Sequence, residues 1–126
     1  MLADLTLIVL AFIITDIRQA HRQAKIVQKL SYIFGQATDN PDNILRSREM
    51  LRLLECIGIY DTIENRDYMV SQIEAAFYDS TNIIRTQLDG RIVKDALLMG
   101  KRGALRMETV WQNNKLITIF LKSGGN

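Results

Sequence analysis

Few residues of this chain have the chemistry that catalysis needs. His21 is the single histidine, and histidine is the usual general base near neutral pH. The single cysteine, Cys56, lies in LLECIGIY among apolar neighbours, which favours a buried and unreactive thiol. A Ser–His or Cys–His pair would require His21 itself. We therefore expect no catalytic residue and no enzymatic activity.

One acidic cluster has a spacing that could suit a metal ion. Asp61, Glu64 and Asp67 recur at every third residue, so a helix could carry them on one face. The same acids also suit the first turns of a helix, where they cap free N–H groups and face the positive end of the helix dipole. This second interpretation is the stronger one, and the glycines do not have the spacing of a phosphate-binding loop. We expect neither a metal site nor a cofactor.

Basic residues gather in the C-terminal third of the chain. The candidates for nucleic-acid contacts are Arg91, Lys94, Lys101, Arg102 and Arg106. Residues 68–122 could form a helix, a turn, a second helix and a hairpin, which is the order of a winged helix, and its cations could contact phosphates. Asp89 and Asp95 interrupt the patch, and a net charge of +2 is too small to indicate nucleic-acid binding by itself. Nucleic-acid binding is therefore an alternative.

The N-terminal segment is apolar on every side if it forms a helix. Its large apolar side chains are Leu5, Leu7, Ile8, Val9, Leu10, Phe12, Ile13 and Ile14. Such a helix must be surrounded by lipid or by protein. Residues 1–15 would extend about 22 Å as a helix, which is short of the roughly 30 Å hydrocarbon core of a bilayer. A membrane anchor and a buried core helix both stay open, with the anchor slightly favoured.

A basic face follows the apolar segment on the same expected helix. It consists of Arg18, Arg22, Lys25 and Lys29, and the apolar positions nearly opposite are Ile17, Ala20, Ala24 and Val27. Cations directly after an apolar run suit lipid headgroups or another anionic partner. The positive-inside rule would then place the bulk of the chain on the cytoplasmic side of the plasma (inner) membrane. A cytoplasmic location without a membrane is the alternative.

Helix signals dominate the chain as far as residue 99. In a single domain of 126 residues we expect a long helix over 1–34, a helical core over 41–99 and a possible hairpin over 105–122. A seven-residue repeat predicts a packing seam that consists of Ile63, Val70, Phe77 and Ile84. The predicted fold class is therefore mainly α, a small helical bundle with a long N-terminal helix.

The stretch IITDIRQAHRQAK, together with LRSREMLRLLE, resembles a group of small uncharacterised bacterial proteins. Those proteins have one N-terminal transmembrane helix, an "IRQA"-type juxtamembrane helix and a helical cytoplasmic domain. The likeness covers residues 5–55 and implies a protein that crosses the membrane once, but it implies no activity.

These observations lead to one functional hypothesis and two alternatives. The first is a membrane-anchored helical protein that scaffolds, regulates or assembles other components through self-association. The second is a soluble winged-helix-like DNA-binding or adaptor protein whose N-terminal helix forms the core of an oligomer. The third is a structural subunit of a larger viral or cellular assembly. All three predict a homo-oligomer or another protein as partner.

Overall fold

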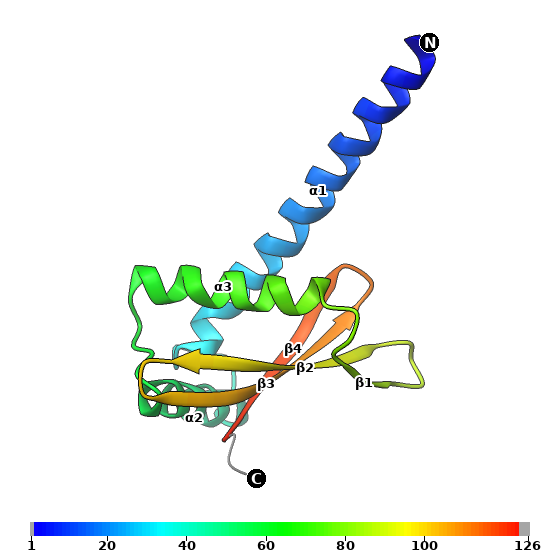
Figure 1. Ribbon diagram of the computed structural model, residues 1–126. Coiled ribbons are helices and arrows are strands. Elements are labelled where there is room, and N and C mark those ends of the chain that lie inside the picture. Colours follow the sequence, from blue (N-terminus) through cyan, green and yellow to red (C-terminus); the bar gives the residue numbers. More distant parts are fainter. Residues whose placement is uncertain (1, 124–126) are drawn as a thin grey trace.

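The computed structural model describes residues 2–123 of the chain, and the side chains from residue 4 onward. Three helices come first, followed by a four-stranded antiparallel sheet in the order β1-β2-β3-β4 (Figure 1). The helices are α1 (Leu2–Ile33), α2 (Pro41–Cys56) and α3 (Ile63–Tyr78). The strands are β1 (Ile83–Thr86), β2 (Ile92–Gly100), β3 (Gly103–Gln112) and β4 (Lys115–Ser123).

The fold is therefore mixed α+β, and the prediction of a mainly α bundle was wrong. The segment 91–99, expected to be a helix, is β2, which pairs along its whole length with β3. Short apolar runs do not distinguish a strand from a buried helix by periodicity alone. The neighbouring strand decided between them, because pairing with β3 satisfies the backbone groups of β2. The hairpin expected over 105–122 is present as β3 and β4, but it is half of the sheet rather than an appendage.

Helix α3 ends at Tyr78, before the last residue of the predicted packing seam, Ile84. Asp79 stops it: its Oδ1 accepts hydrogen bonds from the backbone N–H and the hydroxyl of Thr81, at 2.8 and 2.6 Å. The Lys94 ammonium then donates to the carbonyl oxygens of Phe77 and Asp79, at 2.6 and 2.8 Å. A cation at this position satisfies the free carbonyls of the helix end and complements its dipole. Burial of the Lys94 ammonium lowers its pKa.

The early end of α3 divides the predicted packing seam. Ile84 lies in β1 rather than on the helix, and Ile63 is 79% exposed at the first residue of α3. Val70 and Phe77 do pack against the core. The seven-residue repeat is thus partly a coincidence of spacing across a helix end.

The core lies between the helices and one face of the sheet. On β3, alternate residues point into it, namely Leu105, Met107 and Trp111, as the two-residue period of a strand requires. The helices contribute buried residues to the same cluster, among them Ile26, Leu30, Ile33, Phe34, Leu54, Met69 and Ile73. Only the C-terminal third of α1 takes part.

The N-terminal part of α1 projects away from the rest of the molecule (Figure 1). Its large apolar side chains, predicted to lie in lipid or in a core, are between 48% and 67% exposed. Within residues 2–123, no helix combines the length and the apolar character needed to cross a bilayer. The prediction of a membrane anchor, and with it the prediction of a location at the inner membrane, was therefore wrong.

The turn between β2 and β3 packs directly against the end of α2. The backbone N–H of Arg102 donates to the carbonyl oxygen of Ile57 at 2.9 Å. A Cβ placed on Gly100 would lie 2.1 Å from that same oxygen, so the close approach requires glycine. The two loops are thereby held against each other.

We expect Gly100→Ala to lower the free energy of unfolding by about 3 kcal/mol, because the added methyl group would push the hairpin turn away from α2. Urea unfolding followed by circular dichroism measures the change. Gly90→Ala is the matched control, since Gly90 has a φ of 86° but nothing within 4 Å of an added Cβ. Its loss should be only about 1 kcal/mol, and equal losses in both variants would contradict the contact.

Candidate functional site

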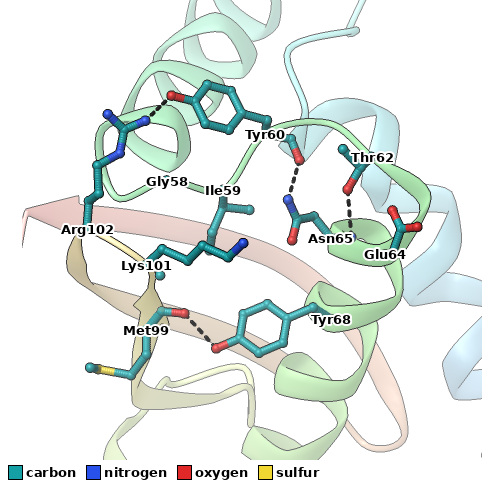
Figure 2. Close-up of a pocket in the computed structure, with 11 residues that line it drawn as sticks. Gly58, Ile59, Tyr60, Thr62, Glu64, Asn65, Tyr68, Met99, Lys101 and Arg102 are labelled. Carbon is teal, nitrogen blue, oxygen red and sulfur yellow. Dashed lines mark hydrogen bonds between the residues drawn. The ribbon is translucent and has the colours of Figure 1, made fainter.

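A pocket of about 840 Å³ lies where the α2–α3 loop meets the β2–β3 turn (Figure 2). Tyr60 and Tyr68 lie on opposite sides of it, and the Lys101 side chain reaches between them. Arg102 comes from the same turn as Lys101, and Glu64 from the first turn of α3. The pocket therefore combines two aromatic rings, two cations and one carboxylate.

Hydrogen bonds to the hairpin hold both tyrosines in place. The Tyr60 hydroxyl accepts from the Arg102 guanidinium, whose Cζ lies 5.6 Å from the centroid of the Tyr60 ring. The Tyr68 hydroxyl donates to the carbonyl oxygen of Met99 at 2.6 Å. These contacts join residues 42 and 31 positions apart in the chain. The walls of the pocket are thus positioned before any ligand arrives.

The start of α3 forms the third side of the pocket. The Thr62 hydroxyl caps the helix by accepting from the backbone N–H of Asn65 at 3.1 Å. The Asn65 amide group donates to the Tyr60 carbonyl oxygen at 2.8 Å, which fixes the preceding loop. Because the positive end of the helix dipole points toward this side, it adds to the positive potential of the two cations.

Two of the acids predicted to cap this helix, Asp61 and Glu64, make different contacts. Asp61 forms an ion pair with Arg66 at 2.6 Å, and the hydrogen bond from Arg66 lowers the pKa of the Asp61 carboxyl. Glu64 lines the pocket. Within the described part of the chain, no group of three or more potential ligands from His, Cys, Asp and Glu could hold a metal ion.

The predicted nucleic-acid residues do not form one patch. Lys101 and Arg102 lie at the pocket, but Lys94 is 8% exposed and caps α3. Arg91 and Arg106 form ion pairs, with Asp89 at 3.3 Å and with Asp95 at 3.1 Å. The second helix of the expected winged helix is β2. Sequence reasoning missed Tyr60 and Tyr68, since nothing in their local pattern indicates which distant turn they contact.

The basic face expected on α1 is also divided. Arg18 is exposed, and Lys25 and Lys29 are half-buried, whereas Arg22 is 4% exposed. Its guanidinium forms an ion pair with Glu74 on α3, with a distance of 2.8 Å from Nε to Oε1. These four residues therefore do not form a continuous exposed basic face that a partner could contact.

Arg22 is the centre of a buried polar network. Its guanidinium also donates to the Tyr78 hydroxyl at 2.5 Å and to Oδ1 of Asn114 at 2.6 Å. The Phe77 ring lies on one face, with its centroid 4.1 Å from Cζ. Burial opposes the charge on Arg22, but Glu74 and Tyr78 together outweigh it and raise the pKa of the guanidinium. The network joins α1, α3 and the β3–β4 turn.

The two residues with the most evident chemistry lie elsewhere. His21 is exposed on α1. Cys56 is exposed at the end of α2, so the expectation of a buried thiol was wrong.

A second candidate site is the projecting part of α1. Nine large apolar side chains form what we call the α1 apolar surface: Leu5, Leu7, Ile8, Val9, Leu10, Phe12, Ile13, Ile14 and Ile17. Folded monomers rarely expose an apolar patch of this extent, and such patches usually mark a binding surface. Asp4 and Arg18, both exposed, lie at its two ends.

No protein-family model matches the sequence, and no curated protein does either. The fold is similar to that of a chain in a solved structure, the contact-dependent growth inhibition toxin–immunity protein complex from Klebsiella pneumoniae 342. The TM-score is 0.64 and the sequence identity 23%, over 75% of this chain and 95% of that one. At this identity the likeness establishes the fold.

We expect Arg22→Met to lower the free energy of unfolding by about 3 kcal/mol or more, because it leaves the Glu74 carboxylate buried without its cation. Chemical unfolding of the variant measures this loss. Arg48→Met, at an exposed position on α2, is the control and should change stability by less than about 0.5 kcal/mol.

The double variant Arg22→Met, Glu74→Met tests the cause. Replacing both members of a buried ion pair by apolar side chains is often neutral, so much of the loss should be recovered. A double variant as unstable as the sum of the two single variants would contradict the ion pair as the cause.

Proposed function

We propose that this chain functions by binding protein, as an adaptor whose projecting helix α1 forms the core of an oligomer. The observation that carries the proposal is the α1 apolar surface, whose nine side chains are 48% to 67% exposed. The hydrophobic effect strongly favours removing such a surface from water. We further propose that the chain catalyses no reaction of its own.

The extent of the α1 apolar surface matches that of a protein interface. A stable complex of ordinary size buries roughly 800 Å² on each partner. Nine large side chains that are about half exposed supply an area of roughly this order. Because the apolar side chains point in every direction around the helix, more than one neighbouring helix is needed to cover them.

The charges at the ends of the surface favour a second copy of the chain as the neighbour. In an antiparallel pair of α1 helices centred on Ala11, Asp4 of each copy would lie opposite Arg18 of the other. The same alignment would place Leu5 opposite Ile17 and Ile8 opposite Ile14, while Thr6 would lie opposite Asp16 and Leu7 opposite Thr15. Ala11 at the crossing point would let the two backbones approach closely.

The fold likeness supports a role in protein binding. The similar chain belongs to a complex of a toxin and an immunity protein. If this chain belongs to such a pair and is not an enzyme, its role would be immunity-like, that is, it would act by occupying its partner. Self-association through α1 would then present several copies of the helical and sheet domain together.

Light scattering coupled to size-exclusion chromatography tests the oligomer. We expect the chain to have at least twice its monomer mass of 14.4 kDa. The double variant Leu10→Glu, Ile14→Glu should have the monomer mass, because four or more charges in a paired apolar surface are costly to bury. The unfolding temperature of this variant should lie within about 2 °C of that of the wild-type chain at a dilution where the wild type is monomeric.

Leu88→Glu is the matched control. Leu88 is fully exposed in the β1–β2 turn, outside the α1 apolar surface, so its substitution should leave the oligomer intact. A wild-type chain that stays monomeric at tens of micromolar, or a double variant with the wild-type mass, would overturn the proposal.

A further inference from the structure

We infer that the pocket between the α2–α3 loop and the β2–β3 turn binds a nucleotide, that is, a phosphate group joined to a flat aromatic base. The inference rests on the side chains of the pocket and is independent of the proposed oligomer. A free mononucleotide and the terminal nucleotide of a single strand both have this phosphate and base. The experiment below distinguishes between these two ligands.

The pocket has the size for such a ligand. Its volume of about 840 Å³ lies within the range of roughly 300–1,000 Å³ that is usual for sites of small molecules and cofactors. Tyr60 and Tyr68 lie on opposite sides (Figure 2), and both rings are fixed by hydrogen bonds with the hairpin: the Tyr60 hydroxyl accepts from Arg102, and the Tyr68 hydroxyl donates to the Met99 carbonyl oxygen. Bases stack readily on aromatic side chains, and any base can do so.

The cations of the pocket suit a phosphate. Lys101 reaches between the two tyrosines (Figure 2), and within the described residues it makes no ion pair. Arg102 uses one nitrogen for the Tyr60 hydroxyl and keeps further donors for a ligand. Helix α3 begins at Ile63, so the positive end of its dipole faces the same space. A phosphate would therefore be met by three positive sources.

The one acid of the pocket, Glu64, could also contact a bound nucleotide. Glu64 is exposed at the start of α3, where its carboxylate can accept hydrogen bonds from ribose hydroxyls or from an amino group of a base. Glu64 would repel the carboxylates of an acidic peptide as it would a phosphate, so the two aromatic rings, on which a base can stack, are what favours a nucleotide. The combination of rings, cations and a single acceptor favours a nucleotide over an acidic protein segment.

The pocket is held in shape without a ligand. The backbone N–H of Arg102 is bonded to the Ile57 carbonyl oxygen, and Gly100 packs against the same carbonyl group. These contacts place Lys101 and Arg102 beside the α2–α3 loop, so little conformational entropy is lost when a ligand binds.

Amide NMR spectra of the full chain, titrated with UMP and AMP, test the inference. We expect shifts in residues 58–68 and 99–102, with affinity at least about tenfold higher than for uridine or inorganic phosphate alone. A short single-stranded oligonucleotide with a terminal phosphate separates the two sources: tighter binding than UMP assigns the site to strand ends, and equal or weaker binding assigns it to free mononucleotides.

Matched variants locate the binding. Lys101→Ala should weaken UMP binding about tenfold, the usual effect of losing one charge-assisted contact. Lys115→Ala, at the exposed first residue of β4, should have no effect. Tyr68→Leu should also weaken binding, whereas Tyr68→Phe, which keeps the ring, should largely retain it. The unfolding temperature of each variant shows whether it is folded.

Three results would overturn the inference. These are no shifts at millimolar UMP, equal affinity of wild type and Lys101→Ala, or tighter binding of a short acetylated acidic peptide than of UMP. The Leu10→Glu, Ile14→Glu variant leaves the pocket unchanged, so it should bind UMP like the wild type. Loss of the oligomer and loss of nucleotide binding are therefore observed separately.

Discussion

The buried ion pair between Arg22 and Glu74 determines how the long helix is attached to the rest of the protein. On its C-terminal side, α1 packs Ile26, Leu30 and Ile33 into the core. On its N-terminal side, the helix makes almost no contact with the domain and projects from it (Figure 1). Arg22 lies at the boundary and is bonded to α3 through Glu74 and to the β3–β4 turn through Asn114. The direction of the α1 apolar surface depends on this junction.

A second constraint acts at the opposite end of α3. There the β2–β3 turn approaches the end of α2 so closely that only glycine fits at residue 100. The approach brings Lys101 and Arg102 to the loop that carries Tyr60. The molecule thus has two separate binding surfaces with different chemistry. One is a projecting apolar helix, which suits protein, and the other is a polar and aromatic pocket, which suits a small anionic ligand.

Local signals predicted the parts of the fold that are stabilised locally. Asn40 and Pro41 open α2 with a local cap, in which the Asn40 side chain accepts from the backbone N–H of Asn43 at 2.9 Å. The Asn113-Asn114 turn divides two strands, with Asn113 in the left-handed region at a φ of 54°. These features depend on neighbours within a few residues. The seven-residue repeat through Ile84 and the helical core as far as residue 99 failed because these residues lie in strands that pair with a neighbouring strand, as Ile92 does with Trp111, and the local pattern does not show that pairing.

For the candidate site, the sequence identified Lys101 and Arg102 among the candidate nucleic-acid contacts, but it did not identify the tyrosines. The sequence by itself determined the composition of each surface: an apolar segment before Asp16, a basic turn, and the caps of α2. Only the tertiary structure decided which of these features lie in the core, which are exposed and which meet. Arg22 shows this most clearly, since its spacing with Arg18 suggested an exposed stripe. Its burial depends on Glu74, 52 residues away. The physical reason is that the stability of a buried charge depends on a partner in space, and local periodicity carries no information about that partner.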